Sequence, residues 1–241
     1  MANIPMPRTE NRASPLQVRS NKTVEQILRA TSELLGEVGF EKLSTNGICA
    51  RAGLTPPALY RYFPNKYAVL KTLGERLMDK QNALLEKWAQ NEFNPHTLEA
   101  EIFEHLKLTL DVTRAEPAGE WIMRSLHASP VLSNVRLQSH RHVTKLLVAR
   151  VMHFDPKLDE AMIYDRVRLG IEMSYATIEM IFDETELDET SVLENASSLL
   201  AQNIKLALNS RGKNKSRASK RGNLRGAKRT MLHSKQPIER P

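Results

Sequence analysis

The chain has little of what several classes of protein require. Its 241 residues include a single cysteine, Cys49, which excludes an intrachain disulfide framework and a cysteine-based zinc site. No stretch reaches the roughly 20 apolar residues of a membrane-spanning helix, and the first residues lack the apolar core of a signal peptide. We therefore expect a cytoplasmic protein without a membrane partner, in which Cys49 is a buried small side chain rather than a redox sensor.

Sequence patterns of catalysis and cofactor binding are also missing. The chain has no glycine-rich phosphate loop, no nucleophile elbow and no His-Glu-x-x-His motif. His140 and His142 are two residues apart, so on a helix they point to different sides, and no carboxylate or cysteine is spaced to complete a metal shell. The sequence predicts no enzyme, no bound metal and no cofactor.

The scarcity of glycine and of alternating β-branched residues favours an all-α fold. The chain has 10 glycines, and its apolar residues recur at helical spacing between joints marked by proline or glycine. Helices are predicted from about Ser20 or Thr23 to Val38, with Gly39 as the stop, from Ser44, from Thr55, from Pro64, and over about 96–113, 117–127, 130–152, 157–182 and 189–208. The domains predicted are a flexible arm over 1–18, a DNA-binding head over 19–66 with a linking helix from 65, a helical regulatory and dimerisation domain over 67–210, and a disordered basic tail over 211–241.

Charge is distributed unevenly along the chain. The first 80 residues carry 12 Lys and Arg against 7 acids, residues 81–210 carry 12 against 20, and residues 211–241 carry 11 against 1. Phosphate repels the acidic middle, which leaves contact with nucleic acid to the head and possibly the tail.

Residues 43–66 carry the most specific local pattern, two short helices around a tight turn. Ser44 is placed to cap the first helix, and Gly53 supplies the left-handed conformation that ends it. Thr55 is placed to cap the second, and the two prolines that follow lie in the first turn, where an N–H has no partner within the helix. This is a helix-turn-helix, which makes DNA the first partner to consider.

The second helix of this unit has a buried and an outer side. Leu59 and Phe63, four residues apart, are predicted to face the core. Ala58, Arg61 and Tyr62 are left on the outer side, with Tyr60 at its border. An ordinary helical hairpin would not explain this outer cluster, which we interpret as the surface that enters a major groove.

Residues 52–66, Ala-Gly-Leu-Thr-Pro-Pro-Ala-Leu-Tyr-Arg-Tyr-Phe-Pro-Asn-Lys, resemble the DNA-binding signature of the TetR family of transcriptional regulators, of the TetR/AcrR type. Gly39-Phe40 and Leu43-Ser44-Thr45 fit the same pattern, so the resemblance covers roughly the first third of the chain. Gly47 and Cys49 depart from it at positions that bear on packing. The resemblance implies phosphate contacts by Ser44, Thr45, Thr55, Tyr60 and Lys66, and base or groove-wall contacts by Pro56, Pro57, Ala58, Arg61 and Tyr62.

The resemblance also implies a small-molecule pocket in the acidic helical domain. Aromatic residues and methionines there could line an adaptable apolar cavity, although such residues more often form a core. The candidates for ligand binding are Trp121, His127, Met152 and Tyr175, and His140 and His142 are further polar candidates.

The last two predicted helices are the candidates for a dimer interface, because small residues beside their apolar stripes permit close contact. TetR-like proteins pair in this way. The interface residues predicted are Met173, Thr177, Met180, Leu193, Leu200 and Ile204. The alternative is that both stripes close the core of their own subunit.

These observations predict a ligand-responsive repressor that binds a palindromic double-stranded DNA operator as a homodimer at the nucleoid. The alternative from another class is an architectural protein in which the basic tail supplies most of the DNA affinity and no effector exists. An all-α enzyme is the third and least favoured reading.

Overall fold

The computed structural model describes residues 18–209, with side chains from residue 21 onward. The predicted arm and basic tail lie outside these residues. Secondary structure is helical throughout the described chain, which confirms the all-α prediction. The helices are α1 (Val18–Lys42), α2 (Thr45–Ala52), α3 (Pro56–Tyr60), α4 (Lys66–Ala89), α5 (Leu98–Ala115), α6 (Gly119–Ala128), α7 (Ser133–Phe154), α8 (Glu160–Asp183) and a C-terminal helix over 189–209.

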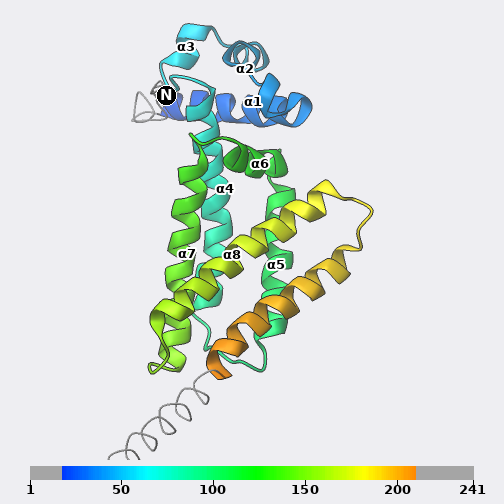
Figure 1. Cartoon of the computed structure of the whole chain (residues 1–241). Helices are drawn as coiled ribbons and strands as arrows, with labels where there is room; N and C mark the ends of the chain where they lie inside the picture. The colour runs from blue at the N-terminus through cyan, green and yellow to red at the C-terminus, as the bar shows by residue number, and fades with distance from the viewer. Residues whose placement is uncertain (1–17, 210–241) are drawn as a thin grey trace, which may run out of the picture.

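Helices α1, α2 and α3 gather at one end of the molecule, and α4 runs from that end through the body (Figure 1). In the body α7 packs against both α4 and α8, while α5 packs along α4. Helix α8 and the C-terminal helix, yellow to orange in Figure 1, cross the body on one side. One helix, α4, thus belongs to both the head and the body.

The head is built on a small apolar core. Ile27 and Leu35 of α1 meet Ile48 of α2 and Leu59 of α3, all 0% exposed. Phe63, which follows α3, is 1% exposed, so the predicted inward pair Leu59 and Phe63 is confirmed. Full burial of such side chains stabilises each by about 1.5–3 kcal/mol, which holds α3 at a fixed angle to α1.

Helix α1 differs from its predicted end. Gly39 leaves the helical conformation with φ 72° as expected, but the chain resumes a helical turn that ends at Lys42. A Cβ on Gly39 would lie 3.4 Å from the Trp121 ring of α6. The glycine therefore permits both the kink and the close packing of head against body.

The helices of the body begin two or three residues later than the prolines suggested. Pro117 and Pro130 lie in the turns before α6 and α7 rather than in their first turns. Ala118 takes a left-handed conformation, φ 57°, between Pro117 and α6. No helix among the described residues combines the length and the apolar character that a membrane crossing needs.

Candidate nucleic-acid interface and internal cavity

The turn between α2 and α3 has the geometry that its sequence predicts. The Ser44 hydroxyl accepts a hydrogen bond from the Gly47 N–H at 3.1 Å and so caps α2. Gly53 is left-handed, φ 63°, and the next N–H, that of Leu54, donates to the Cys49 carbonyl at 2.9 Å. Cys49 is 3% exposed, and burial raises the pKa of its thiol, as expected for a packing residue rather than a redox sensor.

Helix α3 begins without a side-chain cap. Thr55 has the extended backbone of an N-cap residue, but its hydroxyl makes no capping hydrogen bond. It is exposed, together with Pro56 and Pro57 at the start of the helix. Because both prolines lack an N–H, the first turn needs little capping, and the Thr55 hydroxyl remains available to an external group.

The outer side of α3 presents an aromatic ring and a cation. Tyr60 is 36% exposed, and its hydroxyl lies 3.0 Å from the Thr45 hydroxyl of α2. Arg61, the next residue, is exposed. Tyr60 and Thr45 therefore form one hydroxyl pair that bridges the two helices on the face where Arg61 and the prolines lie.

Tyr62 is a correction to the predicted outer face. It is 8% exposed and belongs to the core cluster of the head, with the Arg61 guanidinium 5.9 Å from its ring centre. Helix α3 ends at Tyr60, and Tyr62 lies beyond its last residue. The turn that follows, in which the Tyr62 N–H donates to the Leu59 carbonyl, directs the ring inward.

Lys66 lies where the end of α1 meets the start of α4. Its ammonium group donates to the Phe40 carbonyl at 3.1 Å and lies 4.8 Å from the Phe40 ring centre. The Asn65 side chain caps the same helix start by accepting from the Ala68 N–H at 3.0 Å. Lys66 is half-buried, so its remaining N–H donors can face an anion while its stem stays packed.

Two other cations of the head form ion pairs within it. Arg51 of α2 pairs with Glu37 of α1, and Arg76 of α4 pairs with Glu25 of α1. The hydrogen bond from Arg51 lowers the pKa of the Glu37 carboxyl. These pairs tie α1 to its neighbours and leave Arg61 as the cation on the outer side of α3.

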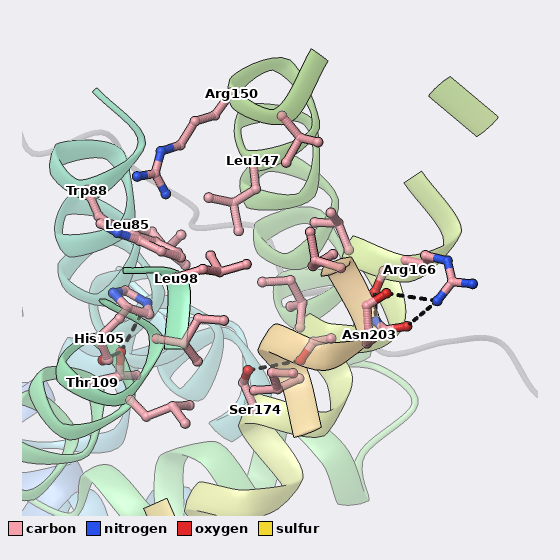
Figure 2. A pocket seen from close by; sticks show the side chains of 18 of the residues that line it. Leu85, Trp88, Leu98, His105, Thr109, Leu147, Arg150, Arg166, Ser174 and Asn203 are labelled. Atoms are coloured by element: carbon pink, nitrogen blue, oxygen red, sulfur yellow. Dashed lines mark hydrogen bonds between the residues drawn. The ribbon is translucent and has the colours of Figure 1, made fainter. Parts of the chain in front are cut away.

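A cavity of about 90 Å³ lies within the body, between α4, α5, α7, α8 and the C-terminal helix (Figure 2). Most of its lining is apolar, from Leu85 and Leu98 on one side to Leu147 and Ile171 on others. Figure 2 shows Trp88 and His105 along one wall and Ser174 on another. The arrangement is that of a small-molecule site, mostly apolar with a few polar groups.

Hydrogen bonds link the cavity to α4. The Tyr175 hydroxyl of α8 donates to the Gln81 side-chain oxygen of α4 at 2.9 Å, and the Gln81 amide donates to the Thr113 hydroxyl at 2.7 Å. Burial raises the pKa of Tyr175, so it remains a neutral donor. A ligand that displaces Tyr175 would act directly on the helix that leads into the head.

The structure brings one of the four candidate ligand residues, Tyr175, to this cavity. Trp121 packs against Gly39 instead, and His127 lies on the surface beside Glu179. Met152 packs against an apolar cluster whose members Leu98 and Val151 line the cavity, but it is not a lining residue itself. Helical spacing gives the face of a residue but not the helix that it meets, so it did not place these three residues at this cavity, and their contact with a ligand stays a prediction.

The two further histidine candidates also lie elsewhere. His140 is fully buried between α7 and α8, where its ring contacts Glu172, and burial lowers its pKa to about 4. His142 is exposed and pairs with Glu86 at 2.8 Å.

His105 is the histidine of the cavity, and sequence reasoning missed it along with Arg150, Arg166 and Asn203. It follows the apolar positions of α5 at helical spacing from Ile102, which was a usable signal.

The predicted dimer residues divide between two faces. Leu193, Leu200 and Ile204 of the C-terminal helix are at most 9% exposed and pack inside the subunit, which is the alternative that the sequence left open for this stripe. Met173 and Thr177 of α8 are half-exposed, and Met180 is 39% exposed.

The same two helices carry an outward stripe, which includes the predicted Met173 and Met180 of α8 and also residues of the C-terminal helix that the prediction did not select. Leu169, Met173, Ala176 and Met180 share one face of α8 by their spacing of four, three and four residues. On the C-terminal helix Leu199 and Leu206 are 62% and 51% exposed. Reciprocal hydrogen bonds between Arg166 and Asn203 hold the two helices side by side. An outward apolar surface of this kind fits a protein–protein contact.

The head matches a known family model. Residues 27–73 match the model described as bacterial regulatory proteins, tetR family. The class C tetracycline repressor protein of Escherichia coli is 43% identical over 54 residues, which are 22% of this chain and 25% of that protein. The chain therefore matches about a quarter of the length of the tetracycline repressors.

Other relatives match over most of their length. The HTH-type transcriptional regulator UidR of E. coli K12 is 20% identical over 191 residues, 77% of this chain and 94% of that protein. A tetR-family transcriptional regulator from Streptomyces coelicolor superposes with a TM-score of 0.60 at 17% identity, covering 78% of this chain and 82% of that one. The structure of Salmonella enterica GusR superposes with a TM-score of 0.57 at 19% identity, covering 80% of this chain and 100% of that one. The body thus shares its fold with these regulators.

Proposed function

We propose that the chain, whose residues 27–73 match the tetR family model, is a transcriptional repressor of that family. In this proposal it binds a palindromic operator as a homodimer and releases it when a small molecule fills the internal cavity. The proposal depends on the exposed side of α3 and its two flanking residues. Thr55, Pro57, Tyr60 and Arg61 are exposed there, while the buried Leu59 holds the helix against the core of the head.

The chemistry of that face suits a DNA backbone and groove. Hydroxyls of Thr45, Thr55 and Tyr60 can donate to phosphate oxygens, and the Lys66 ammonium adds a charge-assisted contact. Arg61 can form a bidentate contact to a guanine edge, and the proline rings can contact thymine methyl groups.

A dimer would place two such helices in successive major grooves, about 34–36 Å apart along the duplex. The outward stripe of α8 and the C-terminal helix, with Met180, Leu199 and Leu206, is the surface that we assign to the pairing. Two helices from each subunit would bury this stripe as a four-helix interface.

The ligand response follows from the shared helix. Gln81, Leu85 and Trp88 line the cavity from α4, whose first turn holds Lys66 in the head. A ligand that moves this helix changes the separation of the two recognition helices, and about 1–3 kcal/mol of coupling is enough to weaken operator binding 5- to 150-fold.

Selection from a randomised double-stranded oligonucleotide pool tests the proposal with the full chain. We expect enrichment of one inverted repeat whose half-sites are about one helical turn apart, bound at least a thousandfold more tightly than random duplex at 150 mM salt. Equal binding to all sequences would contradict the proposed function.

A further inference from the structure

The charged groups around the cavity determine which ligands can enter it. Arg150 and Arg166 are among its lining residues, and no Asp or Glu side chain lines it in the described chain. Two cations would suggest an anionic ligand if their charge were available inside. The hydrogen bonds of each arginine show that it is not.

Arg150 is already neutralised. Its guanidinium donates to the Glu101 carboxylate at 2.7 Å and to the Asn91 and Glu92 carbonyls at 2.8 Å each, and its face covers the Trp88 ring at 4.8 Å. Burial alone would raise the pKa of Glu101, but hydrogen bonds from Thr97, Arg150 and Trp88 lower it. The carboxylate therefore stays ionised, and an incoming anion would have to compete with it.

Arg166 is turned outward. Figure 2 shows its guanidinium directed away from Trp88 and His105, toward the outer side of Asn203. It donates to the Asn203 carbonyl and side-chain oxygens at 2.8 and 2.9 Å. Arg166 thus joins α8 to the C-terminal helix rather than presenting a charge to the cavity.

The other polar groups of the lining are neutral, and His105 is the titratable one beside Trp88. His105 stacks on Trp88 with ring centres 5.3 Å apart, and burial lowers its pKa to about 4. One ring nitrogen lies 3.4 Å from the Thr109 hydroxyl, which itself donates to the His105 carbonyl at 2.8 Å. Within the described residues the other ring nitrogen has no hydrogen-bond partner, so the imidazole can offer one hydrogen bond to a ligand.

The volume sets the size of that ligand. At roughly 10–15 Å³ for each water, a cavity of this size, about 90 Å³, would hold about six to nine waters. This corresponds to an organic molecule of about ten non-hydrogen atoms.

We propose that the cavity binds an uncharged, largely apolar molecule of about ten non-hydrogen atoms with one hydrogen-bonding group beside His105. This inference rests on the ligand response proposed above and adds the chemical class of the effector. Transfer of an ionic head group into this lining is unfavourable, because no free counter-charge offsets the loss of its hydration.

Three probes of one shape and three charges test the proposal. They are 4-methylbenzamide, 4-methylbenzoate and 4-methylbenzamidinium, each titrated at pH 7 into the full chain carrying Trp121→Phe. Trp88 is then the only tryptophan, since the chain has two. We expect a saturable change of Trp88 fluorescence with the amide, at a Kd at least tenfold lower than for either ion. Thermal melts of the wild-type chain with the same compounds give the ranking independently of the variant.

Two neighbouring residues of α7 provide matched controls. Leu147 lines the cavity and Leu146 does not, and both are half-buried. Leu147→Phe fills the cavity and should weaken amide binding at least tenfold, whereas Leu146→Phe should leave it unchanged. Equal loss in both variants, or none in Leu147→Phe, would overturn the assignment to this cavity.

The remaining outcomes separate the two proposals. Either ion binding as tightly as the amide, or the absence of any saturable amide signal, overturns the uncharged class. If the same preparation selects an inverted repeat, the proposed function stands although this ligand class is wrong. If the amide binds and no repeat is selected, the function fails and the cavity assignment survives.

Discussion

Individual residues of the head perform separate tasks on two sides of α3. Leu59 is fully buried and fixes the helix, while Tyr60, the next residue, is 36% exposed. The Tyr60 hydroxyl meets Thr45 at 3.0 Å, so it is positioned before any DNA arrives. Such positioning lowers the entropy lost when a contact to phosphate forms.

Tyr60→Phe should weaken operator binding about 2- to 12-fold, because one hydrogen bond contributes about 0.5–1.5 kcal/mol. The fold should be retained, since the lost hydroxyl is on the surface. Fluorescence anisotropy with a labelled operator measures the change. Tyr164→Phe, in the body, is the control and should bind as the wild type; unchanged affinity in Tyr60→Phe would remove this residue from the interface.

His105 makes stability depend on pH. Its folded pKa of about 4 lies below the ordinary value of 6.5, so protons bind preferentially to the unfolded chain. The contribution of the neutral His105 to the free energy of unfolding is therefore complete above pH 6.5 and is lost as the pH falls toward 4. The cause is burial, which disfavours the charged imidazolium.

His105→Phe should flatten this dependence while keeping an aromatic ring beside Trp88. Between pH 7 and pH 5 the wild type should lose about 2 kcal/mol more unfolding free energy than the variant. Urea denaturation at the two pH values measures it. The exposed His142 provides the comparison, because His142→Gln should lose as much unfolding free energy between the two pH values as the wild type. An equally steep loss in His105→Phe would show that His105 is not the cause of the pH dependence.

At the scale of elements, the turn between α2 and α3 depends on the backbone of one glycine. Gly53 has φ 63°, and a Cβ built on it would meet no atom within 4 Å. A substitution there is thus opposed by conformation alone. Gly36 in α1 is helical, and its added Cβ would be 3.7 Å from that of Ala118, an ordinary contact.

Gly53→Val should destabilise the fold by about 1–2 kcal/mol, because a β-branched residue resists the left-handed conformation. Gly36→Ala should instead stabilise it by up to about 1 kcal/mol, as expected for a helix interior. Thermal and urea unfolding of the two variants measure the contrast. A Gly53→Val protein as stable as the wild type would mean that the turn tolerates another geometry.

At the scale of the whole molecule, the outward stripe decides whether two subunits pair. Leu199 is 62% exposed on the C-terminal helix, and Leu108 is 48% exposed on α5 and lies outside that stripe. Both are large, exposed and apolar, so they differ mainly in location.

Leu199→Glu should shift the protein to monomers and weaken operator binding at least tenfold, because charges would be buried without partners in the dimer. Leu108→Glu should affect neither property. Analytical ultracentrifugation and operator titration measure both. A dimeric Leu199→Glu protein with full affinity would place the interface elsewhere.

The basic tail adds a prediction at this same scale. Residues 211–241 carry 11 cations and 1 acid, and they lie outside the described residues. If four of these cations meet phosphates, deleting the tail should reduce the log–log salt slope of binding by about 3.6 and leave the preferred repeat unchanged. A tail of equal length with glutamine for each cation is the control and should behave like the deletion; an unaltered slope would exclude the tail from DNA contact.

The sequence by itself determined the helices and the turn of the head. Ser44, Gly53 and the prolines after Thr55 act through hydrogen bonds and φ angles of their own neighbourhood, so local reasoning found them. The spacing of Leu59 and Phe63 likewise gave their burial.

The tertiary structure alone decided three other features: the inward turn of Tyr62, the outward face of the C-terminal helix and the set of residues that meet at the cavity. That helix has one apolar line through Leu193 and Leu200 and another through Leu199 and Leu206. The helical period is compatible with burial of either line, because it shows only which residues share a face and not which face is buried. Which face is buried depends on packing between helices that are far apart in the chain, and the free energy of that packing is not a local property.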